Sequence, residues 1–368
     1  MNELDISIIS PYTGKESLPD ISYADLMYKH FCVEPIINQN ILRYSFDNNK
    51  GYRFYTKPCL CFLDDKNFEI HTDDFDELFD SEKIKSFKSN VIKEDYSNCS
   101  KCSKYQNYKQ GSDSAFYNWQ SFIEEYGLYG KRYYYNKDKI DDYPLYSINL
   151  NISEVCNLKC KTCRKDFITK EPDLTPEDYE KIVKKIKTVK RLKIGCDGET
   201  FFSKIYMKIL SEDLTKDSEL ESIEIFTNGT CMTEKRLKEI HPNNWDIIKE
   251  VRISIDAATK ETYKLVRANN DNQWENLLKN IKYLKENYNV KMASCFTISK
   301  YNYKDTMDFI DFAENLGFDE VAFAFAKPRL KDNDRECVIT NETYKKDIIE
   351  KINEIVFYKS RKINVVLT

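Results

Sequence analysis

The chain contains the stretch YSINLNISEVCNLKCKTC at residues 146–163, in which an alternating segment leads directly into three closely spaced cysteines. Residues 146–153 alternate apolar and polar side chains, which is the period of a half-buried β-strand. Cys156, Cys160 and Cys163 follow on one short loop. Thiolates are the usual ligands of iron–sulfur clusters, so these three can bind three irons of a [4Fe–4S] cube. The fourth iron would lack a protein ligand, and an open coordination position is typical of a reactive metal site.

Six segments from residue 146 onward have the pattern of strands, and helical segments separate them. The expected strands are 146–153, 191–198, 221–229, 251–257, 290–298 and 319–326. Such alternation predicts a parallel sheet with right-handed crossovers. Six units are too few for an eight-fold barrel. The sequence therefore predicts an α/β fold, a partial (β/α)6 TIM-like barrel, over residues 146–368.

Two further motifs come where expected strands end. GCDGET at residues 195–200 follows the second strand, and TNG at residues 227–229 ends the third. Active sites of such folds lie at the carboxyl ends of the strands. We therefore expect these motifs and the cysteine loop to meet on one face of the barrel.

Residues 1–145 are less regular. They hold a second cysteine group, a segment with helical character at residues 113–127, and a tyrosine-rich stretch at residues 131–146. The predicted organisation is a small cysteine-rich module at 1–110, a helical, tyrosine-rich connection at 111–145, and the barrel at 146–368.

Composition narrows the class of protein. The 368 residues include 57 basic and 61 acidic side chains, a net charge of -4 that argues against an extended nucleic-acid surface. No apolar run approaches the ~20 residues that span a membrane. The N-terminus lacks a signal-peptide pattern, so we expect a cytoplasmic protein. The chain has twelve cysteines and only three histidines. Because thiols stay reduced in the cytoplasm, this composition favours thiolate–metal chemistry over disulfides.

The cysteine loop resembles the signature of the radical S-adenosylmethionine superfamily. The resemblance implies that the open iron of a [4Fe–4S] cluster binds S-adenosylmethionine. It also implies reductive cleavage to a 5′-deoxyadenosyl radical, fed by an external one-electron donor such as flavodoxin or ferredoxin. Many members have an aromatic residue before the last cysteine, where this chain has Thr162. A zinc loop is the alternative, but zinc sites favour paired two-residue spacings.

The resemblance also suggests residues that bind the cofactor. Gly198 would let the backbone approach it closely, and the carboxylate of Glu199 would accept a hydrogen bond from the methionine ammonium. Asn228 and Ser254 match polar positions after the third strand and in the fourth. Arg267 matches an arginine that reaches the methionine carboxylate. A turn asparagine, a core serine and a solvated arginine are the structural alternatives for the last three.

The second cysteine group resembles the SPASM/twitch module, which carries an auxiliary [4Fe–4S] cluster. The resemblance implies four ligands, Cys32, Cys59, Cys99 and Cys102. Cys61 lies two residues from Cys59, so on a strand it points the same way and could replace it. The module usually follows the barrel, whereas here it precedes it. A zinc site and unligated thiols are the alternatives.

The expected reaction is hydrogen abstraction from a peptide or a small-molecule, sugar-type substrate, with the auxiliary cluster as electron acceptor. Two alternatives remain open. Cys295, on the fifth strand, could return a hydrogen atom, which would make the protein an epimerase. The chain could instead be a non-catalytic iron–sulfur protein that transfers electrons or senses redox state.

Overall fold

The computed structural model describes most of the C-terminal two thirds of the chain and part of the rest. The described residues are 30–32, 38–43, 54–57, 70–72, 75–93, 95–99, 102, 116–118, 121–122, 126, 130, 145–163, 166–267, 270, 272–326, 338–339, 341–358 and 362–367. The chain divides into two compact units. One comprises Met1–Asn40 and Thr56–Tyr146, and the other comprises Ile41–Tyr55 and Ser147–Thr368.

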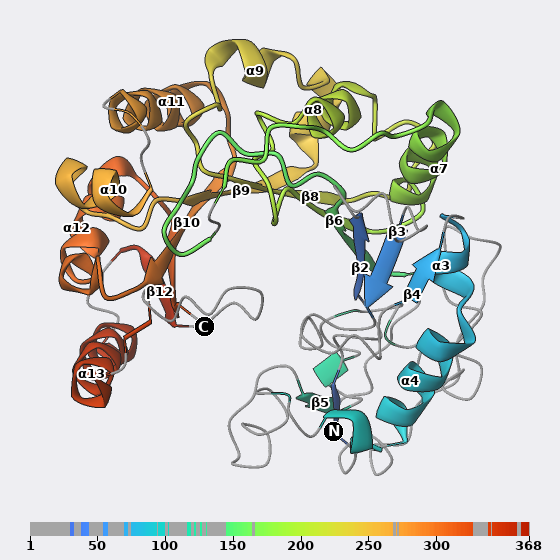
Figure 1. Cartoon of the computed structure of the whole chain (residues 1–368), viewed down its shortest axis with the longest axis horizontal. Helices are drawn as coiled ribbons and strands as arrows, with labels where there is room; N and C mark the ends of the chain where they lie inside the picture. Colours follow the sequence, from blue (N-terminus) through green and yellow to red (C-terminus); the bar gives the residue numbers. More distant parts are fainter. Residues whose placement is uncertain are drawn as a thin grey trace, which may run out of the picture. The chain divides into compact units, whose positions relative to one another are not determined.

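Seven consecutive strands lie side by side in the second unit, and every adjacent pair is parallel (Figure 1). Their spatial order follows the chain from β6 to β12. The strands are β6 (Ser147–Asn151), β7 (Arg191–Ile194), β8 (Ser222–Thr227), β9 (Ile248–Ser254), β10 (Lys291–Ile298), β11 (Glu320–Phe325) and β12 (Asn364–Leu367).

At least one helix connects each strand to the next, as right-handed crossovers require. The helices are α7 (Pro176–Ile186), α8 (Lys204–Ser211), α9 (Glu234–Lys238), η5 (Pro242–Asp246), α10 (Lys260–Val266), α11 (Gln273–Asn287), η6 (Tyr303–Asp305), α12 (Asp308–Leu316) and α13 (Glu342–Tyr358). N-cap side chains fix where several of these helices begin. At α7, for example, the Thr175 hydroxyl accepts a hydrogen bond from the Asp178 amide at 3.1 Å. The helices lie along the outer side of the curved sheet (Figure 1).

The predicted α/β partial barrel with six strand–helix units is confirmed, and the structure adds a seventh strand. β12 pairs in parallel with β11 in the register Val321 to Val365. A short apolar run is ambiguous between strand and helix by periodicity alone, so the sequence did not predict a strand at residues 364–367. Burial of Ile363 and Val365 explains why this segment joins the sheet.

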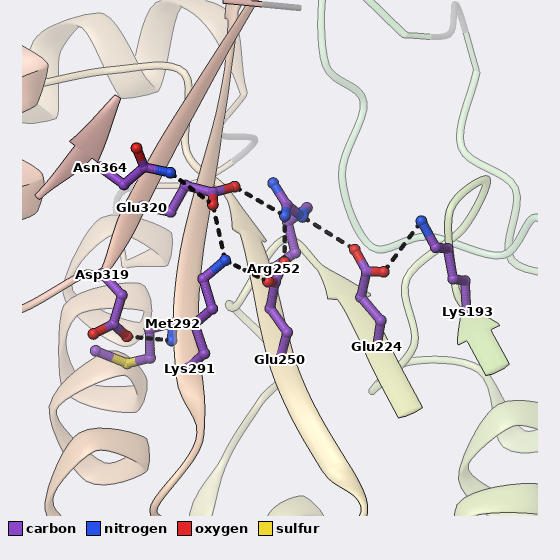
Figure 2. A network of polar contacts seen from close by, with 9 residues as sticks. All are labelled: Lys193, Glu224, Glu250, Arg252, Lys291, Met292, Asp319, Glu320 and Asn364. Carbon is purple, nitrogen blue, oxygen red and sulfur yellow. Dashed lines mark hydrogen bonds and ion pairs between the residues drawn. The ribbon is translucent and has the colours of Figure 1, made fainter. Parts of the chain in front are cut away.

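The two faces of the sheet differ in chemistry. Side chains such as Ile194, Ile225 and Ile253 are fully buried on the helix-covered face. The alternate positions carry a network of ion pairs across neighbouring strands (Figure 2). At its centre, Arg252 Nε lies 3.3 Å from Glu224 Oε1 and Arg252 Nη2 lies 3.1 Å from Glu320 Oε1. The network also includes Lys193, Glu250 and Lys291.

The first unit combines short strands and helices. Its described elements are β1 (His30–Cys32), β2 (Asn38–Arg43), β3 (Phe54–Lys57), β4 (Ile70–Thr72), α3 (Glu77–Asp80), α4 (Glu82–Ile92), η3 (Ser97–Cys99) and β5 (Phe116–Asn118). β1 and β5 pair antiparallel, with Cys32 opposite Phe116. The sequence favoured a helix over 113–127; residues 116–118 form a strand instead, whereas Ser121, Phe122 and Tyr126 are helical. The predicted division at residues 110 and 145 stays a prediction.

None of the helices in the described part of the chain has the length and apolar character needed to cross a membrane.

Candidate active site

The loop that leaves β6 carries the three cysteines of the sequence motif. Cys156 and Cys160 are buried and Cys163 is half-buried, and all three pack with Leu158. Backbone hydrogen bonds fix the loop at two points: Cys156 N donates to Ile168 O at 2.8 Å, and Lys161 N donates to Val266 O at 2.9 Å. The three thiols are therefore presented together from one anchored segment at the carboxyl end of the first barrel strand.

Glu199 ties this loop to the ends of β7 and β8. Its amide donates to Val155 O at 2.8 Å, beside the first cysteine. Its carboxylate is fully buried and accepts hydrogen bonds from Thr227 Oγ1 at 2.6 Å, Asn228 N at 2.5 Å and Phe201 N at 3.2 Å. Burial raises the pKa of Glu199, and these hydrogen bonds oppose the shift. Glu199 thus joins the cysteine loop, through its amide, to the end of β8, through its carboxylate.

Gly198 lies against the backbone of the cysteine loop. A Cβ atom at this position would approach Ser153 O to 2.5 Å and Val155 O to 3.0 Å. Real Cβ atoms do not come that close to backbone oxygen, so only glycine permits this packing. The structure therefore gives Gly198 a role in seating the loop, and its contact with a cofactor stays a prediction.

Asn228 contacts the first of the three cysteines. Its Nδ2 lies 3.7 Å from Cys156 Sγ and donates to Asn157 Oδ1 at 2.9 Å. Its Oδ1 accepts from Thr230 N at 2.9 Å and from Thr230 Oγ1 at 2.6 Å. Leu158 N also donates to Cys156 Sγ, at 3.4 Å. The side chain predicted to touch the cofactor is thus fixed by hydrogen bonds in contact with the first thiol.

Arg267 lies near Cys160 and forms a buried ion pair with Asp256. The Arg267 Nη1 and Asp256 Oδ2 atoms are 2.8 Å apart, and the two side chains are 11% and 5% exposed. The same carboxylate accepts the Thr297 amide at 2.6 Å. Burial raises the pKa of the Cys160 thiol to about 12, and the Arg267 guanidinium opposes that shift. The alternative of a solvated helix arginine is excluded.

Asp256 is a site residue that sequence reasoning missed. It follows β9 in the segment ISID and adopts a positive φ of 58°. Aspartate tolerates this left-handed conformation better than most residues. Two features of the sequence could have identified Asp256. It is a carboxylate directly after a strand, and it lies eleven positions before an arginine that needed a partner.

Ser254 and Cys295 lie opposite each other in the register of β9 and β10. Both are half-buried and occupy the face of the sheet that carries the ion-pair network. Burial raises the pKa of the Cys295 thiol, while nearby Arg252 opposes the shift. The structure therefore brings the two predicted side chains together on adjacent strands.

The donor set fits an iron–sulfur cluster. Two N–H groups approach Cys156 Sγ, as expected for a thiolate that carries negative charge. The Nε of Arg267 is buried, and no acceptor faces it among the described residues. In the described part of the chain, no group of three or more His, Cys, Asp or Glu side chains is arranged to hold a metal ion. In a cube each thiolate binds a separate iron, so the sulfurs need not converge on one point.

The second cysteine group is described only in part. Cys99 and Cys102 are buried, and Cys102 N donates to Cys99 O at 2.9 Å. The backbone of Cys32 belongs to β1. Cys59 and Cys61 lie outside the described residues. The four-cysteine set therefore stays a prediction.

The chain is thus an α/β protein with a partial parallel barrel and three buried or half-buried cysteines on the loop after the first barrel strand. The family model of the Radical SAM superfamily matches residues 150–313, a little under half of the chain. Residues 150–313 are therefore similar to the Radical SAM superfamily.

Two curated relatives, both named GTP 3′,8-cyclase, come from Clostridium perfringens strains SM101 and 13. Each is 26% identical over 121 residues, which is 32% of this chain and 36% of the relative. The matched region thus spans about a third of the length of these relatives.

Solved structures with similarity to the chain include Streptococcus suis SuiB bound to the precursor peptide SuiA. That structure has a TM-score of 0.48 and 15% identity, over 82% of this chain and 67% of SuiB. Native anSMEcpe with bound AdoMet and Cp18Cys peptide has a TM-score of 0.46 and 16% identity, over 58% of this chain and 60% of anSMEcpe.

Proposed function

We propose that this protein holds a [4Fe–4S] cluster on Cys156, Cys160 and Cys163 and uses it to cleave S-adenosylmethionine. When bound, the cluster supplies the electron that breaks a carbon–sulfur bond of S-adenosylmethionine, and the resulting 5′-deoxyadenosyl radical takes a hydrogen atom from the substrate. The observation that best supports this proposal is that the three cysteines share one anchored loop at the carboxyl end of the first barrel strand. This loop lies within the region that matches the Radical SAM family model.

The residues around the loop would position the thiolates. Asn228 Nδ2 and the Leu158 amide both approach Cys156 Sγ, so they would stabilise the negative charge of that ligand. Glu199 fixes the loop through Val155 and through the end of β8. These contacts would hold the first cysteine in one orientation, which a cluster with only three protein ligands requires.

Arg267 and Ser254 would bind S-adenosylmethionine. The guanidinium of Arg267 has a buried Nε that no described residue satisfies, which suits a carboxylate ligand. Asp256 keeps the guanidinium in place through its 2.8 Å ion pair. Ser254 would contribute a hydroxyl from the neighbouring strand end.

The substrate would be a peptide or a sugar-type small molecule, and the net reaction an oxidation or modification. An auxiliary [4Fe–4S] cluster on Cys32, Cys59, Cys99 and Cys102 would accept the second electron. Burial of Cys99 and Cys102, three positions apart, supports this module. Because the curated relatives are named for cyclising GTP, a nucleotide is the alternative substrate class.

Epimerisation is a second candidate, favoured by the position of Cys295. This half-buried thiol lies beside Ser254 on the face of the sheet away from the helices, and burial keeps its proton in place. A protonated thiol is the form that can donate a hydrogen atom. Incorporation of solvent deuterium into a product with inverted stereochemistry would distinguish this reaction from net oxidation.

Anaerobic reconstitution tests the proposal. We expect about eight irons per chain if both cubes form and about four if only the barrel cluster does. Addition of S-adenosylmethionine should change the electron paramagnetic resonance spectrum of the reduced cluster. Replacing Cys156, Cys160 and Cys163 together with alanine should remove one cluster, while Cys196→Ala, at an exposed cysteine, should not. Unchanged iron content and an unchanged spectrum in the triple variant would contradict the proposal.

A further inference from the structure

Basic side chains surround the cysteine loop in an otherwise slightly acidic protein. The sequence KCKTCRK at residues 159–165 places four basic residues around two of the three cysteines, although the whole chain has a net charge of -4. Lys159 and Lys161 are exposed in the structure. The local charge at this loop is thus opposite in sign to the net charge of the chain.

A lysine from another part of the barrel joins this charge. Lys161 Nζ lies 5.3 Å from the centre of the Tyr301 ring, and Lys300 Nζ lies 5.0 Å from the same centre. The ring therefore brings together two ammonium groups, one from the cysteine loop and one from the segment after β10. Neither Lys161 nor Lys300 forms an ion pair with a carboxylate in the part of the chain that the structure describes. Two like charges near one ring, without a counter-ion among the described residues, favour an anionic partner.

Exposed apolar side chains accompany these lysines. Phe167, four residues after Cys163, is 49% exposed, and Leu265 is 47% exposed. Leu265 precedes Val266, whose carbonyl accepts the Lys161 amide at 2.9 Å. Apolar side chains among charged ones are the composition of a transient protein–protein contact.

We propose that Lys159, Lys161, Lys300 and Tyr301, with Phe167 and Leu265, form the docking surface for an acidic one-electron carrier protein. This docking surface rests on the proposed function, because a carrier needs a cluster to reduce. The reduced carrier would lose one electron and the oxidised cluster would gain it, with no bond made or broken. Because Lys159 and Lys161 flank Cys160 in sequence, a carrier bound here would lie beside the cluster loop.

Charge explains why an acidic protein fits this surface. Opposite charges on two partners raise the rate of encounter by about 10- to 1,000-fold, and salt screens the effect. The net charge of -4 would otherwise repel an acidic partner. Lys159, Lys161 and Lys300 make the local charge positive at the surface where the electron must enter.

The test uses the reconstituted full-length enzyme and flavodoxin as the acidic carrier. Lys300→Glu changes a residue far in sequence from the cysteines, and Lys161→Glu changes the loop itself. Lys235→Glu, at an exposed lysine of α9, is the matched control. Stopped-flow absorbance measures the rate of cluster reduction by reduced flavodoxin at several salt concentrations. A small photochemically reduced deazaflavin provides the rate without docking, and titration with oxidised flavodoxin gives the affinity.

We expect Lys300→Glu and Lys161→Glu to slow reduction by flavodoxin by about tenfold at low salt and to weaken its binding. Reduction by the deazaflavin, and the behaviour of Lys235→Glu, should match the unchanged protein. Flavodoxin rates and affinities equal to those of the unchanged protein would overturn the docking surface. Slowing by both reductants, or weaker substrate binding with normal flavodoxin rates, would also overturn it. A preparation without a reducible cluster would instead refute the proposed function.

Discussion

Substituting Asp256 by asparagine should strongly destabilise the barrel. The change removes the negative charge that faces Arg267 at 2.8 Å and leaves a guanidinium that is 11% exposed. Asparagine tolerates the positive φ of 58° at this position and keeps an oxygen for the Thr297 amide, so backbone strain and that hydrogen bond stay nearly constant. The substitution therefore isolates the buried charge.

The expected loss is about 3 kcal/mol, because breaking a buried ion pair by removing one partner costs roughly 3–5 kcal/mol. Equilibrium unfolding in urea should show this as a fall in midpoint on the order of 1 M. Asp256→Asn combined with Arg267→Met should recover part of the loss, since the unpaired charge is then gone.

The control is an exposed ion pair of similar length. Glu234 and Lys238 on α9 are 2.6 Å apart, and their side chains are 56% and 62% exposed. Glu234→Gln should change stability far less than Asp256→Asn, because solvent already screens this pair. Equal effects of the two substitutions, or a double variant no more stable than Asp256→Asn alone, would refute the reasoning.

Three further predictions concern other polar contacts. Tyr206→Phe removes a buried hydroxyl that bonds both Ser153 N and Ser153 O, so the free energy of unfolding measured in urea should fall by about 1–3 kcal/mol; an unchanged urea midpoint would argue against these bonds. Asn228→Leu removes the amide beside Cys156 Sγ, so the midpoint potential of the reconstituted cluster, measured by redox titration, should become more negative. An unchanged potential would show that this contact does not reach the cluster. Hydrogen bonds from Thr215 hold the pKa of Asp213 at about 2. The contribution of the Asp213 carboxylate to stability is therefore present above the ordinary carboxyl pKa and is lost as pH falls toward 2. A titration of this carboxyl near the ordinary value, followed by NMR, would contradict this prediction.

The barrel was predictable because its signals are local and repeated. Alternating or apolar segments ended at Gly198 and Gly229, and each was followed by a helical period. β12 was missed because four strand residues after a long helix carry little periodic information. Its place in the sheet depends on pairing with β11, which is a tertiary contact.

The sequence predicted which residues belong to the site better than it predicted the contacts between them. The spacing of the cysteines predicts a shared loop, and the structure confirms that the loop leaves β6. The sequence did not predict that Asn228 reaches Cys156 Sγ or that Gly198 packs on Ser153 O, because both contacts join segments far apart in the chain. The pairing of Asp256 with Arg267 was equally hidden, since it depends on how β9 ends.

The three cysteines carry the central claim, and production of 5′-deoxyadenosine tests it most directly. The full-length protein, reconstituted with iron and sulfide and reduced in the presence of S-adenosylmethionine, should form 5′-deoxyadenosine detectable by chromatography. Single alanine substitutions of Cys156, Cys160 or Cys163 should abolish it, and Cys196→Ala should leave it unchanged. Formation of the nucleoside at the normal rate by any of the three variants, or none by the reconstituted and reduced unchanged protein, would contradict the account.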